Sequence, residues 1–103
     1  LQALLEDRAG TTWLGVTNRG LYRVDPRTRS PQRVRLNPAA ATATDTVMSL
    51  LEDRSGRLWA GTPHALVHLD PTTSAVRRRY PTEVPVNYLD EDPAGRLWLA
   101  GDG

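Results

Sequence analysis

The sequence predicts an all-β chain of consecutive four-stranded antiparallel sheets, and three observations carry this prediction. A block that ends in tryptophan occurs three times in order, at Trp13, Trp59 and Trp98, with spacings of 46 and 39 residues. The blocks between these copies read as short strands separated by turn residues. Several of the strands are apolar on both faces, so their sheets need a neighbour on each side.

The repeat predicts the architecture. Each copy places an aspartate and a glycine at fixed distances ahead of its tryptophan, which gives the structural repeat positions Asp7, Gly10, Trp13, Asp53, Gly56, Trp59, Asp92, Gly95 and Trp98. Beyond the tryptophan, "GLYRVDP" (20–26) matches "ALVHLDP" (65–71), and "RVRL" (33–36) matches "RRRY" (77–80). A unit of roughly 40–46 residues is typical of a four-stranded β-propeller blade.

We therefore predict a β-propeller fragment of about two blades plus the start of a third. It forms a single propeller segment over 1–103, with blade 1 at 1–36, an inter-blade loop at 37–46, blade 2 at 47–80 and the start of blade 3 at 81–103.

The first strand of each unit is predicted at 1–6, 47–52 and 86–91. The second copy, "VMSLLE", is apolar almost continuously, which is typical of a strand buried on both faces. A D-x-x-G turn follows each copy. We expect the Asp53 carboxylate to accept backbone N–H groups of that turn, and Gly56 to take the left-handed position that closes the hairpin. An acid/base role for the Glu-Asp pairs, and a calcium loop beginning at Asp90, are the alternatives. The calcium loop lacks the later acidic ligand and the flanking helices.

The remaining strands follow in order. Strand "RLWAGT" (57–62) carries Trp59, whose recurrence at one register favours packing between blades over a sugar-stacking platform. Strand "ALVHLD" (65–70) comes next, and "AVRRRY" (75–80) is the last. Charged side chains on an outermost strand protect its free edge from pairing.

Composition limits the function. The 103 residues carry 13 Lys plus Arg and 12 Asp plus Glu, a net charge of +1, which argues against a nucleic-acid partner. Cysteine is absent, so neither disulfides nor thiolate chemistry is available. No apolar run reaches the ~20 residues of a membrane-spanning helix, and we expect no direct membrane contact by this segment. The chain starts without Met and inside a repeat, from which we expect a piece of a longer protein.

The blocks "LLEDRSGRLWAGT" and "LLEDRAGTTWLGVTNRGLYRVD" resemble the two-component regulator propeller repeat, whose pattern includes E-D-x-x-G-x-[IL]-W-[IVL]-G-T followed by G-L-x-[RK]-[FYV]-D. The copies depart from it at Thr12, at Ala65 and at Ala100, where Gly101 stands one place later. The resemblance implies an extracytoplasmic, periplasmic propeller of a membrane-anchored bacterial receptor. In that family, the output is a histidine kinase, often a hybrid one, or a diguanylate cyclase. The ligands are often carbohydrates or other small molecules.

On this basis we expect a non-catalytic sensory and ligand-binding segment without a cofactor. Its partners are a small-molecule ligand and the remaining propeller blades of the same chain, and a dimer of the full-length receptor stays open. A protein-interaction scaffold and a fragment of an enzyme propeller, a lyase or glycosidase, are the alternatives. Loops that vary on a constant scaffold usually carry specificity, which predicts a ligand at Asn18, Arg19, Thr44, Asp45, Thr62, His64 and Asn87. His64 and His68 lie i, i+4 apart but on a loop and strand, so we expect no metal site there.

Overall fold

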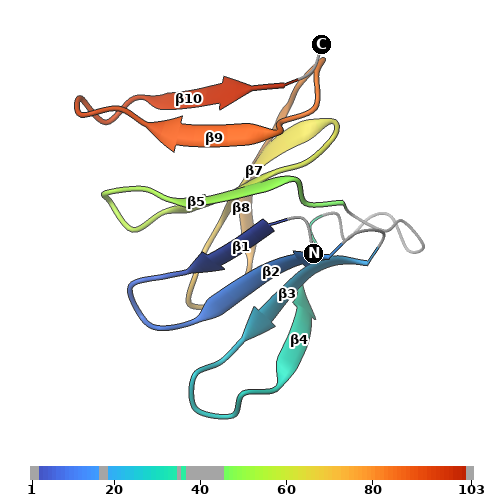
Figure 1. Ribbon diagram of the computed structural model, residues 1–103, viewed down its shortest axis with the longest axis vertical. Coiled ribbons are helices and arrows are strands. Elements are labelled where there is room, and N and C mark those ends of the chain that lie inside the picture. Colours follow the sequence, from blue (N-terminus) through green and yellow to red (C-terminus); the bar gives the residue numbers. More distant parts are fainter. Residues whose placement is uncertain (1–2, 17–18, 35, 37–45, 102–103) are drawn as a thin grey trace.

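The computed structural model describes residues 3–16, 19–34, 36 and 46–101, and these residues form strands and turns without a helix (Figure 1). The strands build two four-stranded antiparallel sheets and one two-stranded sheet, which confirms the predicted all-β class. In each sheet the strands lie in chain order. The first sheet holds β1 (Ala3–Glu6), β2 (Thr12–Val16), β3 (Gly20–Val24) and β4 (Pro31–Val34); the second holds β5 (Ser49–Glu52), β6 (Leu58–Gly61), β7 (Ala65–Leu69) and β8 (Val76–Pro81); the third holds β9 (Tyr88–Glu91) and β10 (Leu97–Ala100).

The three sheets stack through their first strands. Strand β5 lies between β1 and β9 (Figure 1). The turns β1–β2, β5–β6 and β9–β10 lie along one edge of the stack. The antiparallel order places the β3–β4 and β7–β8 turns at the same end, which we call the turn end. The opposite end, with the β2–β3 and β6–β7 connections and the segments between sheets, is the loop end.

The first strands are shorter than the sequence predicts. Residues 1–2 lie outside the described part of the chain, and β5 and β9 each begin two residues later than expected. For β9 the reason is visible at Val86, whose N–H donates to the Thr62 carbonyl, just after β6 of the preceding sheet, over 3.0 Å. The chain thus joins its neighbour before it enters its own sheet.

The predicted outer strand at 33–36 is also displaced, because β4 spans Pro31–Val34. The prediction at 33–36 depends on matching "RVRL" with "RRRY" by their arginines. The pairing instead follows the turns, since Val24 faces Pro31 in the first sheet and Leu69 faces Val76 in the second. A register shift between His68 and Leu69 adds one residue to the second copy and moves its arginines out of step.

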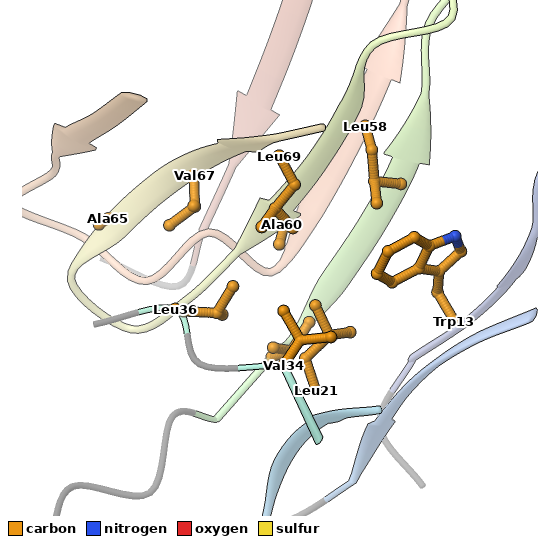
Figure 2. Close-up of a cluster of buried hydrophobic side chains, with 10 residues drawn as sticks. Trp13, Leu21, Val34, Leu36, Leu58, Ala60, Ala65, Val67 and Leu69 are labelled. Atoms are coloured by element: carbon orange, nitrogen blue, oxygen red, sulfur yellow. The ribbon is translucent and has the colours of Figure 1, made fainter. Parts of the chain in front are cut away.

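The main core lies between the first two sheets. Trp13, Leu21 and Val34 of the first sheet meet Leu58, Ala60 and Val67 of the second (Figure 2). A second cluster contains Trp59 and Leu66 of the second sheet, Leu89 of the third, and Val86 just before it. All four residues of β6 are buried, whereas β1 alternates between half-buried and exposed residues. Burial on both faces therefore occurs where a sheet has a described neighbour on each side.

Glycine permits the close approach of consecutive sheets. A Cβ atom at Gly15 would lie 2.7 Å from the Val47 carbonyl oxygen, and one at Gly61 would lie 2.5 Å from that of Val86. Both positions follow two residues after a tryptophan, at the place where the next strand begins. In the third sheet Ala100 holds this position and is exposed.

Candidate functional site

One carboxylate organises the turn of each unit. In the second sheet, Asp53 Oδ1 accepts the N–H groups of Ser55 and Arg57, and Oδ2 accepts the Trp59 indole Nε1–H over 3.0 Å. Gly56 has a φ of 82°, the left-handed conformation that favours glycine. Burial alone would raise the pKa of Asp53, but the hydrogen bonds from Trp59 and from the turn hold it below its usual value. The aspartate therefore serves as a structural acceptor, charged at neutral pH.

The other two units repeat this arrangement. Asp7 accepts from Ala9, Thr11 and the Trp13 indole, and Asp92 accepts from Ala94, Arg96 and the Trp98 indole. The hydrogen bond from Trp98, with further donors from Arg96, lowers the pKa of Asp92. The indole bond was not anticipated from the sequence, although the constant six-residue spacing from aspartate to tryptophan was its signal.

Consecutive turns are joined by a second set of bonds. The Arg8 backbone N–H donates to Glu52 over 3.0 Å, and its guanidinium donates to the Asp53 carbonyl over 3.0 Å. Arg54 does the same one sheet later, to Glu91 over 3.0 Å and to the Pro93 carbonyl over 2.7 Å. Glu52 and Glu91 are thus hydrogen-bond acceptors for the preceding sheet, which explains these two Glu-Asp pairs structurally.

The described members of the predicted ligand set, Arg19, Thr62, His64 and Asn87, lie at the loop end but on or beside successive sheets. Asn18, Thr44 and Asp45 lie outside the described residues. Arg19 and His64 are exposed. Asn87 is half-buried, and its side-chain Oδ1 is buried without a hydrogen-bond partner in the part of the chain that the structure describes. Among these described residues, no hydrogen bond or ion pair joins one predicted side chain to another of a different sheet.

Thr62 has a structural position. The residue is 5% exposed, and its hydroxyl donates to the Ala65 carbonyl while accepting the Ala65 N–H, each over 3.0 Å. It thereby closes the β6–β7 connection. Its donor is fully used within that turn, a constraint that residue type and loop position do not reveal.

The two histidines have different surroundings. The His68 ring stacks on Trp59 with centroids 4.9 Å apart, and burial lowers the pKa of that imidazole. His64 is exposed on the connection before β7. Within the described ranges, no three His, Cys, Asp or Glu side chains are placed to hold a metal ion together.

A cleft at the turn end was not predicted. It has a volume of about 420 Å³, lies between the first and second sheets, and has Pro26 and Pro71 in its walls. Its charged residues are Asp7, Arg8, Arg23, Asp25, Arg27 and Glu52, and we call it the turn cleft. Its signal in the sequence is the difference between Arg23 and His68 at matching positions of the two copies.

Comparison with known proteins agrees with this geometry. Residues 43–64 match the model of the family described as "Two component regulator propeller", which confirms the resemblance predicted from the repeat. No curated protein matches the chain significantly. The chain is similar to the extracellular domain of BT4673 from B. thetaiotaomicron, which one structure describes as a putative hybrid two component system. The TM-score is 0.81, with 23% identity over 95% of this chain. A second structure of that domain, described as a putative one component system, gives a TM-score of 0.76 and 24% identity over 95%.

These similarities establish the fold: the three sheets are β-propeller blades, two with four strands and one represented by its first two. The chain spans 13% of the length of either structural neighbour. In the described residues, no helix is long and apolar enough to cross a membrane.

Proposed function

We propose that this chain is a non-catalytic sensory segment of an extracytoplasmic β-propeller, part of a larger bacterial signal-transduction receptor. The observation that carries the proposal is the two component regulator propeller match at residues 43–64, within blades that resemble the extracellular domain of a putative hybrid two component system. In this function the propeller passes a ligand signal to a histidine kinase or diguanylate cyclase module beyond a membrane. The turn aspartates and glutamates support it indirectly, because their oxygens are engaged in structural hydrogen bonds.

The ligand in this proposal is a small molecule, carbohydrate-like by the family resemblance, that approaches the loop end. Arg19 and His64 supply exposed polar side chains there, and the buried Asn87 Oδ1 lacks a donor. A buried acceptor without a donor is uncommon in folded proteins and marks a place where a polar group is needed.

The test uses the full-length receptor and its own signalling output. Arg19→Ala and Asp45→Ala are expected to weaken the response to the inducing ligand while the protein remains folded and abundant. Ser55→Ala is the matched control, since Ser55 is exposed at the turn end. A response that survives both loop-end variants but is abolished by the change at Ser55 would place the sensory site at the opposite end.

A further inference from the structure

We propose that the turn cleft binds a small hydroxylated organic carboxylate through the guanidinium of Arg23. This site is at the opposite end of the blades from the ligand residues considered above and does not depend on the sensory function. The volume of about 420 Å³ is within the range of small-molecule sites, roughly 300–1,000 Å³. Both sheets that form the cleft are part of this chain.

The acidic residues of the cleft are already supplied with donors. Asp7 takes two backbone N–H groups and an indole N–H, and Glu52 takes the Arg8 N–H, with Arg8 Nε 3.7 Å away. Asp25 accepts the Arg27 N–H on one carboxylate oxygen, over 2.7 Å. The guanidinium of Arg8 is occupied by the second sheet.

Arg23 and Arg27 differ from Arg8. Among the described residues, no carboxylate or carbonyl accepts from either guanidinium. Arg23 lies over the Trp13 ring, with Cζ 5.8 Å from its centroid, and its Nε is buried without a hydrogen-bond partner. A donor without an acceptor costs free energy when it is buried, and Arg23 lines the cleft with a guanidinium that has no acceptor among the described residues.

Covering the Trp13 ring does not require the positive charge of Arg23. Arg23 faces Trp13 across the β2–β3 pair, and His68 faces Trp59 at the same register of the second sheet. His68 covers its tryptophan as an imidazole whose pKa is lowered by burial. A largely neutral ring therefore suffices to cover the indole, and the guanidinium at position 23 is free for another role.

Asp25 and Asp70, at matching positions of the first two sheets, also differ in their partners. In the second sheet Asp70 is paired with Arg77, 2.6 Å away, on the oxygen that its turn leaves free. In the first sheet that oxygen of Asp25 has no described partner. A ligand that fits both groups carries a carboxylate for the planar fork of Arg23 and a hydroxyl that donates to Asp25. The formal charges of the cleft cancel, so recognition depends on local geometry.

The experiment is a calorimetric titration of the full-length protein with 4-hydroxybenzoate, and with 4-hydroxybenzamide as its neutral counterpart of similar shape. We expect saturable binding of the carboxylate and at least about tenfold weaker binding of the amide. Arg23→His, which installs the residue of the second sheet, is expected to weaken carboxylate binding by about 10–100-fold. Arg33→Gln removes an exposed arginine of β4 outside the cleft and should leave binding unchanged.

Three results would overturn the proposal: no binding of 4-hydroxybenzoate at about 10 mM, equal binding of acid and amide, or binding that Arg23→His leaves intact. If Arg23→His lowers the thermal midpoint by more than about 5 °C, Asp25→Asn decides instead, because its amide oxygen can still accept the Arg27 N–H while the acceptor proposed for the ligand hydroxyl is lost. Weaker binding in that variant supports the site, and unchanged binding rejects it. Binding is measured without signalling output, so the result is separate from that of the loop-end test.

Discussion

At the scale of single residues, one aspartate side chain connects the turn of each unit to its tryptophan. Asp53 is 5% exposed and accepts three N–H groups, one of which belongs to the buried Trp59. Removal of such an acceptor leaves several donors without partners, and each unsatisfied buried group costs about 1–3 kcal/mol. The side chain therefore stabilises both the local turn and the contact between sheets.

We predict that Asp53→Ala lowers the free energy of unfolding by about 3 kcal/mol, because the indole and two backbone N–H groups lose their acceptor. Urea unfolding of the full-length protein measures this change. Asp90→Ala is the control, since Asp90 is exposed and, among the described residues, accepts only the adjacent Glu91 N–H. Its expected effect is below about 0.5 kcal/mol. Equal losses in the two variants would contradict a special role for Asp53.

The pKa of Asp53 adds a dependence on pH. Because folding lowers this pKa, the carboxylate contributes stability above its unfolded value of about 3.9, and that contribution is lost as the pH falls toward the folded value. The difference in stability between the wild type and Asp53→Ala should therefore narrow below about pH 4. A difference that stays constant from neutral pH to about pH 3 would show that the charge of Asp53 is irrelevant.

At the scale of elements, the turns and their glutamates join each sheet to the next. The described interfaces use the backbone N–H and the guanidinium of Arg8 and Arg54. Pro93 holds the matching position of the third turn, and proline has neither group. That turn nevertheless keeps its own hydrogen bonds to Asp92. The backbone of the turn thus tolerates proline, while the donors toward a neighbour are lost.

Arg54→Pro gives the β5–β6 turn the proline of the β9–β10 turn. We predict that it lowers the free energy of unfolding by about 1–2 kcal/mol in total. Proline at a compatible position gains about 0.4–1 kcal/mol, but hydrogen bonds to charged groups are worth about 1.5–3 kcal/mol. The loss of hydrogen bonds is therefore the larger effect, and the variant is less stable. Arg54→Ala, which keeps the N–H donor, should fall between Arg54→Pro and the wild type in thermal midpoint. A midpoint above that of the wild type for Arg54→Pro would reverse the order of these two effects.

The strands and turns also show which features can be predicted from the sequence. The three turns, the order of the strands and the two-sided burial of β6 follow from spacing and residue type. The offset between β4 and its predicted match depends on a register shift between His68 and Leu69, which lies in the paired strands beyond a turn that closes alike in both sheets. The occupied hydroxyl of Thr62 and the unpaired Arg23 depend on neighbours in three dimensions. The hydrogen-bonding groups of a polar loop residue can be fully used by its own turn, as at Thr62.

At the scale of the whole molecule, the stack presents apolar side chains at both outer faces. Leu4 is 63% exposed on the first sheet, and Tyr88 and Trp98 are 59% and 57% exposed on the third. Between adjacent sheets, similar apolar side chains are buried against one another. Repeat arrays gain much of their stability from such neighbour contacts, and closed propellers contain about four to eight blades.

We predict that the 103-residue chain, produced alone, associates at micromolar concentration because its outer faces lack a covering sheet. Sedimentation velocity measures this, and a variant with Leu4→Ser and Trp98→Ser should associate less. A monomer that unfolds cooperatively with a high midpoint would show that the two interfaces described here suffice for a stable unit.

The three indoles differ in exposure while sharing one hydrogen bond. Trp13, Trp59 and Trp98 are 0%, 8% and 57% exposed, and each donates Nε1–H to the Oδ2 atom of its aspartate. Indole fluorescence moves to shorter wavelength as water is removed, so differences in emission between them should report hydration more than hydrogen bonding. A protein that retains only Trp98 would then carry a built-in optical probe of the outer face of the third sheet. Its emission would report when a neighbour covers that face, without an attached dye.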